Sequence, residues 1–149
     1  HWDNIAATPS PRVAVIEDLD EPPAFGSLWG EVNANIHRAL GCLGVVTDGG
    51  VRDLDEVREL GFHFFAAEVV PSHAYVHLVD AGEPVSVGGL AVASADLIHA
   101  DQHGVVSIPH EIAREVPRAC QEVEDRERRI IDYCKSPGFR IDGLKSGTY

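Results

Sequence analysis

The chain has 149 residues, 44% of them hydrophobic and 24% charged, a balance typical of one globular domain with a single modest core. Its 24 acidic residues exceed its 12 basic ones, and the formal net charge of −12 argues against nucleic-acid binding because it repels phosphate backbones. Three cysteines without close spacing argue against a disulfide framework or a zinc finger, and without a long apolar run or a signal pattern we expect a cytoplasmic protein that binds no membrane.

The first 40 residues read as a strand, a loop and a helix. A β-branched run at 12–16 predicts a buried strand, and the polar residues of 17–27, which include two consecutive prolines, predict a loop. Residues 28–40 predict an amphipathic helix ended by Gly41, because apolar side chains recur at every fourth position. Those positions are Leu28, Val32, Ile36 and Leu40.

A second strand and a short helix follow. Residues 43–47 are another apolar run, 48–50 form a sharp turn, and 53–60 predict a short helix with Asp53 as its N-cap. Strand, helix and strand across 12–47 make a βαβ unit, whose crossover is right-handed in nearly all proteins. The two strands are therefore expected to lie parallel in one sheet.

The second half of the chain predicts a small β layer followed by a long helix. Short strand-like runs are separated there by glycine, proline and aspartate turns. A charged helix is expected over 109–135, interrupted at Pro117, and an irregular tail over 136–149. We expect all of 1–149 to form one domain. The strand-like runs are 63–69, 74–79, 84–87, 90–92, 97–100 and 104–108.

Glu31 and the pair Arg52-Asp53 are expected to lie together, although twenty residues separate them. The predicted helix runs about 15 Å away from Glu31 at 1.5 Å per residue, and the strand at 43–47 returns about 16 Å. Arg52 and Asp53 are then expected at the carboxyl ends of parallel strands, where open α/β sheets bind their ligands.

These residue types suit the chemistry of a 2-oxo acid. Asp53 offers oxygen ligands for Mg²⁺ or Mn²⁺, and the planar fork of Arg52 can hold a carboxylate by two hydrogen bonds. Glu31 lies at the N-terminus of the predicted helix, where the free amides of Val32 and Asn33 can hold an anion. By spacing alone, an Arg-Asp pair after a turn is more often a helix cap or a surface ion pair than a catalytic pair.

The signature around these residues resembles that of the RraA-like family. That family includes 4-hydroxy-4-methyl-2-oxoglutarate and 4-carboxy-4-hydroxy-2-oxoadipate aldolases, and its hallmark is an acid, twenty intervening residues, Arg-Asp and a further acid. Glu31, Arg52, Asp53 and Glu56 match that hallmark. The resemblance covers nearly the whole chain, through 30–31, 41–53, 71–75, 84–85, 88–89, 96–106, Glu124 and Glu127.

The resemblance implies a swivelling β/β/α domain of the α/β class, with a βαβ unit, a small β layer and a long C-terminal helix, assembled as a trimer or hexamer. It also implies a family N-terminal segment that this chain lacks, so we expect a domain that is incomplete at its N-terminus. Within the motifs, Glu31 stands where the family usually has aspartate, and residues 94–96 replace its usual Pro-Gly-Asp.

For the site, the resemblance implies Mg²⁺ or Mn²⁺ bound at Asp53, largely through water. Arg52 is implied to bind the pyruvyl carboxylate, and Glu31 to orient the waters of the metal. The other implied groups are the substrate-binding amides of Val32 and Asn33, and Glu127, with Glu124 next, from the C-terminal helix of a neighbouring subunit.

The leading hypothesis is a carbon–carbon lyase that cleaves 4-hydroxy-2-oxo dicarboxylic acids to release pyruvate, decarboxylates oxaloacetate, or does both. Loss of the N-terminal segment could leave such an enzyme inactive. The alternative is a non-catalytic protein-binding regulator, because the family is named after members that inhibit a ribonuclease and the acidic surface suits a basic partner. A third hypothesis is a related enzyme acting on another oxo acid or on a sugar acid.

Overall fold

The computed structural model describes residues 1–148, and the chain divides into two compact units, His1–Ile108 and Pro109–Tyr149. The mixed α/β class expected from the sequence is confirmed, because the first unit combines small parallel and antiparallel sheets and the second contains a long helix.

The first unit is built on a parallel sheet of three strands in the order β1-β3-β5. β1 (Arg12–Ile16) lies beside β3 (Cys42–Thr47), with Ala14 opposite Val45, so the predicted βαβ unit is confirmed. β5 (His63–Phe65) pairs with the other edge of β3. Of the β-branched residues that predicted these two strands, Val45 and Val46 of the central strand β3 are buried, whereas those of the edge strand β1 are half-buried.

Two short helices connect the strands of this sheet, α2 (Glu31–Ala39) and α3 (Leu54–Leu60). α3 has Asp53 at its N-cap and ends at Gly61, which adopts the left-handed conformation that favours glycine, both as predicted. α2 begins three residues later than predicted, because the residues before it form a strand.

The buried face of α2 differs from the predicted one. Ala34 and His37 are buried and Val32 is 70% exposed, whereas Ile36 and Leu40 are half-buried, so the predicted stripe forms only part of the face that packs. The small side chain of Ala34 lets the helix approach the sheet, and His37 packs against the indole of Trp29 with ring centroids 4.5 Å apart. Trp29 also stacks with Phe62 at 6.2 Å, and these residues form the centre of the core.

A second, smaller parallel sheet has the order β2-β4-β6. Its strands are β2 (Ser27–Trp29), β4 (Gly50–Val51) and β6 (Glu68–Val69). After β6 the chain crosses to the free edge of β2, where His73 forms an isolated parallel bridge with Ser27. The segment 74–79, expected to be a strand, contains none, because the backbone leaves the sheet immediately after this bridge.

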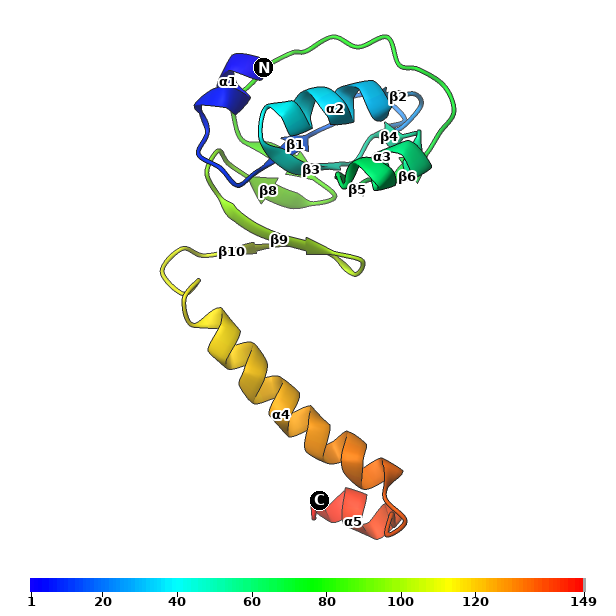
Figure 1. Cartoon of the computed structure of the whole chain (residues 1–149), viewed down its shortest axis with the longest axis vertical. Helices are drawn as coiled ribbons and strands as arrows, with labels where there is room; N and C mark the ends of the chain where they lie inside the picture. The colour runs from blue at the N-terminus through cyan, green and yellow to red at the C-terminus, as the bar shows by residue number, and fades with distance from the viewer. Residues whose placement is uncertain (149) are drawn as a thin grey trace. The chain divides into compact units, whose positions relative to one another are not determined.

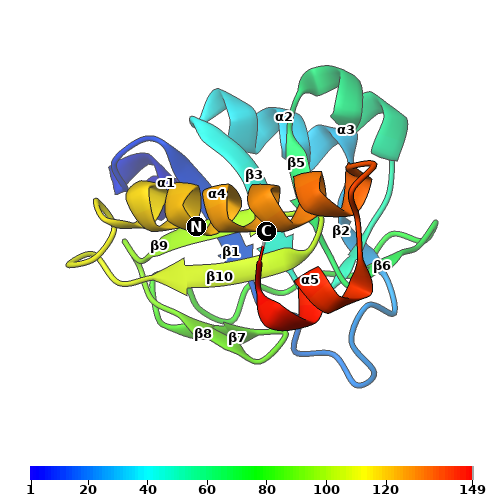
Figure 2. The same ribbon diagram turned by 90° about the horizontal axis from the view of Figure 1, so that it is seen from below.

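Two antiparallel hairpins complete the first unit. β7 (Val85–Val87) pairs with β8 (Leu90–Val92), and β9 (Leu97–Asp101) pairs with β10 (Gly104–Ile108), which agrees with the predicted β layer. Figures 1 and 2 show α2 and α3 on one side of the larger sheet and these hairpins on the other. A short helix, α1 (Trp2–Ala7), precedes β1.

The second unit consists of α4 (Val116–Lys135) and α5 (Ile141–Ser146). The predicted interruption at Pro117 is wrong. Pro117 lies in the first turn of α4, where a backbone N–H would have no intrahelical acceptor and its absence costs no hydrogen bond. α5 lies within the predicted irregular tail, whose last residue falls outside the described part of the chain. None of the helices in residues 1–148 is long and apolar enough to span a membrane.

Candidate functional site

The candidate site lies where β2 and β4 end. β2 leads through Gly30 into α2, and β4 leads into Arg52 and Asp53. Because the two strands are parallel, with Trp29 opposite Val51, their carboxyl ends lie at the same edge of the small sheet. The backbone N–H of Arg52 donates to the carbonyl of Trp29 at 2.9 Å and fixes this register.

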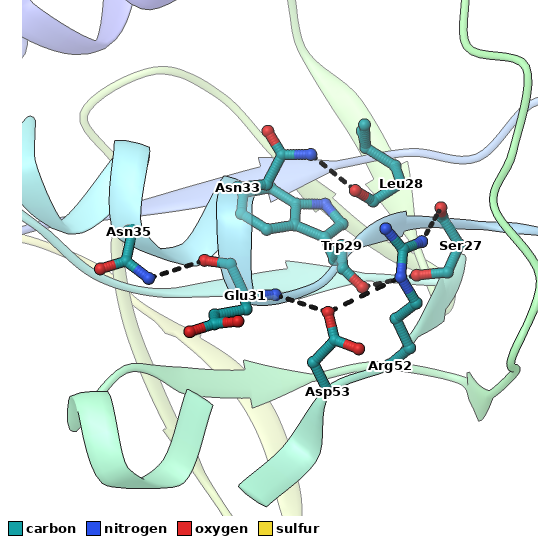
Figure 3. A network of polar contacts seen from close by, with 8 residues as sticks. All are labelled: Ser27, Leu28, Trp29, Glu31, Asn33, Asn35, Arg52 and Asp53. Carbon is teal, nitrogen blue, oxygen red and sulfur yellow. Dashed lines mark hydrogen bonds and ion pairs between the residues drawn. The ribbon is translucent and has the colours of Figure 1, made fainter. Parts of the chain in front are cut away.

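The side chain of Asp53 joins the beginnings of two helices (Figure 3). Asp53 is the N-cap residue of α3, yet its carboxylate makes no capping bond there. Instead its Oδ2 accepts a hydrogen bond of 2.9 Å from the backbone N–H of Glu31, the first residue of α2. The positive end of the α2 dipole favours a negative charge at this position. Asp53 adopts φ 56° and ψ 44°, a left-handed conformation that is costly for a residue with a side chain.

The guanidinium of Arg52 is held from two sides. Its Nη1 donates to the carbonyl of Ser27 at 3.0 Å, and its Nε lies 3.6 Å from Oδ2 of Asp53. Ser27 is fully buried, so its carbonyl holds the guanidinium of Arg52 in a fixed position. In the described chain no group accepts a hydrogen bond from Nη2, and a quarter of the side chain, 24%, is exposed. The orientation of the fork is therefore set in advance, with one nitrogen open to an anion.

Glu31, Val32 and Asn33 form the first turn of α2. The backbone N–H groups of Val32 and Asn33 have no acceptor among residues 1–148, as expected for the first turn of a helix. The carboxylate of Glu31 is exposed and points away from that of Asp53 in Figure 3. The side chain of Asn33 donates to the carbonyl of Leu28 at 2.6 Å and so ties this turn to β2. Of the residues expected at the site, the structure thus brings Arg52, Asp53 and the first turn of α2, Glu31 to Asn33, into one neighbourhood.

The donors present suit a hydrated hard cation better than a fully enclosed one. No three His, Cys, Asp or Glu side chains of residues 1–148 are grouped so that they could hold a metal ion. Oδ1 of Asp53 has no hydrogen-bond partner within that range, and the exposed carboxylate of Glu31 is the other acid at α2. Mg²⁺ keeps several waters and commonly takes only one or two carboxylates, so this donor set fits it. Glu127 and Glu124 are exposed residues of α4 in the second unit.

Sequence reasoning did not identify Ser27, whose role is to hold Arg52. The sequence predicts a loop and a helix for residues 27–29, because a strand of three residues is too short to show an alternating pattern. In the structure the Ser27 hydroxyl donates to the carbonyl of Trp29, and the Ser27 carbonyl also accepts the N–H of Ala74 at 3.1 Å. The only sequence signal was a small polar residue next to Gly26.

A buried histidine lies behind the site. His37 contacts Trp29, and its Nδ1 lies 2.7 Å from the carbonyl of Asn33. Burial lowers the pKa of His37, and the hydrogen bond with the Asn33 carbonyl opposes that effect only in part. His37 is therefore neutral at physiological pH and belongs to the support of α2.

The sequence matches a family model described as RraA-like, Aldolase/RraA, over residues 3–107. An uncharacterized protein from Methanocaldococcus jannaschii is 30% identical over 128 residues, which are 80% of this chain and 58% of that protein. A protein from Halalkalibacterium halodurans with the provisional name 4-hydroxy-4-methyl-2-oxoglutarate aldolase is 28% identical over 111 residues, 71% of this chain and 53% of that protein. The chain thus spans little more than half the length of these relatives.

Two crystal structures share the fold. An uncharacterized protein from Pseudomonas syringae pv. tomato superposes with a TM-score of 0.78 and 28% identity, covering 99% of this chain and 68% of that one. RraAS2 from Streptomyces coelicolor, described as an unusual member of the RNase ES inhibitor RraA protein family, gives a TM-score of 0.66 and 26% identity. That match covers 85% of this chain and 65% of the other.

Proposed function

Because this chain belongs to the RraA-like family, we propose that it is a divalent-metal-dependent carbon–carbon lyase that releases pyruvate from 2-oxo acids. The proposed substrates are 4-hydroxy-2-oxo dicarboxylic acids, cleaved by a retro-aldol reaction, and oxaloacetate, which would be decarboxylated. One observation carries the proposal: the Asp53 carboxylate, the Arg52 guanidinium and the open amides of α2 lie in one connected cluster. The chain covers 58% and 53% of the length of two of its relatives, and we propose that the part present here carries the activity.

Arg52 is proposed to bind the carboxylate next to the keto group. Its guanidinium is already oriented by the Ser27 carbonyl and by Asp53, so little side-chain entropy is lost when a substrate binds. The amides of Val32 and Asn33 are proposed to donate to the same end of the substrate, where the dipole of α2 favours negative charge.

Mg²⁺ or Mn²⁺ is proposed to bind at Asp53 with most of its water shell retained, because Asp53 offers one open oxygen. When bound there, the cation would supply Lewis-acid polarisation of the keto oxygen. Glu31 is proposed to orient waters at the site. Glu127 of a neighbouring subunit, in a trimer or hexamer, is proposed to contribute a further carboxylate.

In the retro-aldol reaction the bond between C3 and C4 breaks while the 4-hydroxyl loses its proton. The C4 fragment leaves as a carbonyl compound, and protonation of C3 completes pyruvate. Glu31 is an exposed acid next in sequence to Val32, and we assign it to the water through which the hydroxyl proton leaves. Arg52 holds the carboxylate in place throughout.

The test is pyruvate release measured by coupling to lactate dehydrogenase. The purified chain would be supplied with Mg²⁺ or Mn²⁺ and a panel containing oxaloacetate and several 4-hydroxy-2-oxo acids. Metal-dependent release from at least one of them is expected. Absence of release from every member of the panel would refute the lyase proposal.

A non-catalytic regulator is the second candidate, and the charge of the first unit favours it. Residues 1–108 contain sixteen acids against four arginines and no lysine, whereas residues 109–149 contain eight acids and eight bases. Such a surface attracts a basic protein partner. Recovery of no stoichiometric partner in a pull-down with the tagged chain would count against this candidate.

A further inference from the structure

Gly30 lies between β2 and α2, directly beside the cluster, and we infer that it positions Asp53 and Arg52. A Cβ atom on residue 30 would approach Oδ2 of Asp53 more closely than the 3.0 Å at which such atoms stop in real structures. It would also lie 3.1 Å from Cγ and 3.2 Å from Nε of Arg52. The carboxylate of Asp53 and the side chain of Arg52 therefore occupy the space that a side chain on residue 30 would need.

The backbone at Gly30 does not itself require glycine. Its φ of −159° and ψ of −165° are extended values that any residue adopts. Gly41 and Gly61, by contrast, have φ of 85° and 70°, where glycine is favoured for its conformation. Any effect of a substitution at Gly30 must therefore come from the added atoms and not from backbone strain.

The carboxylate of Asp53 has little freedom to avoid an added atom. It begins from a backbone in the left-handed conformation, and its Oδ2 accepts the N–H of Glu31, the residue next to Gly30. Moving Oδ2 away from residue 30 lengthens that hydrogen bond of 2.9 Å. Gly30 thus sets both the position of the carboxylate and the distance between the beginnings of α2 and α3.

Gly30→Ala tests the inference through hydrogen exchange of the Glu31 amide. A first-turn amide has no intrahelical partner, so its protection depends on Asp53. After correction for intrinsic rates, exchange in Gly30→Ala is expected to be about ten- to a hundredfold faster than in wild type, which corresponds to losing a hydrogen bond to a charged acceptor. Asp53→Gly should give the same rate. The amides of Val45 and Val46 in β3 should keep their wild-type rates, which separates this effect from general loosening.

Gly138→Ala is the matched control. Gly138 has no positive φ, and a Cβ there would meet nothing closer than the Ser136 hydroxyl at 3.9 Å. Wild-type exchange at Glu31 is expected in this variant. Unchanged protection of the Glu31 amide in Gly30→Ala would overturn the inference.

A second readout uses Mn²⁺ binding followed by electron paramagnetic resonance, and this part rests on the proposed function. Gly30→Ala should weaken Mn²⁺ binding at least tenfold, and Gly30→Ala combined with Asp53→Gly should bind no more weakly than Asp53→Gly alone. Additive losses would overturn the inference. If wild type neither binds Mn²⁺ nor releases pyruvate, the lyase proposal fails while the exchange experiment still decides the role of Gly30.

If Gly30→Ala alone does not fold, the double variant keeps the inference open to refutation. Asp53→Gly removes the carboxylate that the new methyl group would overlap, so Gly30→Ala/Asp53→Gly is expected to fold. Failure of the double variant to fold, with Asp53→Gly alone folding, would show that the crowding does not come from Asp53 and would overturn the inference that Gly30 positions the Asp53 carboxylate.

Discussion

Asp53 combines a left-handed backbone with a carboxylate that does not cap its own helix, which predicts a stability cost at the site. Replacing it by glycine or by alanine removes the hydrogen bond to Glu31 equally, so the difference between the two variants isolates the backbone. Left-handed geometry costs a residue with a Cβ about 1–2 kcal/mol, while glycine loses about 0.5–1 kcal/mol in conformational entropy on folding. Asp53→Gly should therefore be more stable than Asp53→Ala by about 1 kcal/mol.

Urea unfolding of the two variants measures this difference, and the melting temperature should follow it by about 2–4 °C. The matched control is Asp55, an exposed residue in the first turn of α3 paired with Arg58. There the order should reverse, with alanine more stable than glycine by about 1 kcal/mol, because the residue lies in a helix. If Asp53→Ala is as stable as Asp53→Gly, the strain reasoning is wrong.

Three further predictions concern the arginine, the metal and the buried histidine. Arg52→Lys should lower kcat/KM at least about tenfold, because one ammonium group cannot both donate to the Ser27 carbonyl and bind a carboxylate through two parallel hydrogen bonds. Steady-state kinetics with the best substrate measures this loss. A chelator should abolish pyruvate release, and added Mn²⁺ should restore it without a change in circular dichroism. Since burial lowers the pKa of His37, the unfolded chain binds a proton more readily, so stability should hold above the usual pKa of 6.5 and fall as pH drops below it. Urea midpoints on either side of that pH should show the fall in wild type and a smaller one in His37→Leu.

The sequence identified the elements that carry a strong local pattern. β1, β3 and α3 were predicted because β-branched runs, an N-cap aspartate and a terminal glycine are each encoded in neighbouring residues. β2, β4 and β6 have two or three residues each, too few for any periodicity to appear. Their positions follow from long-range pairing, which a local pattern does not contain.

The candidate site, too, could be predicted from the sequence only in part. The rise per residue of a helix and a strand predicts that the chain leaves Glu31 and returns to the same end of the sheet at Arg52 and Asp53. The left-handed backbone of Asp53 and the hydrogen bond from its carboxylate to the N-terminus of α2 could not be predicted, because both depend on how the exits of β2 and β4 face each other. The role of Ser27 could not be predicted either, because Ser27 acts through its backbone carbonyl. The direction of that carbonyl is set by the pairing of β2 with β4.

The most direct measurement of the central claim compares pyruvate release by wild type, Arg52→Ala and Arg58→Ala with saturating Mg²⁺ or Mn²⁺. Arg58 is the matched control because its side chain is 76% exposed and pairs only with Asp55 among the acids of the described chain. Arg52→Ala is expected to lose at least about a hundredfold in kcat/KM, the effect of losing two charge-assisted hydrogen bonds, while Arg58→Ala keeps the wild-type value. Equal activity of Arg52→Ala and wild type would contradict the proposal that Arg52 binds the substrate carboxylate.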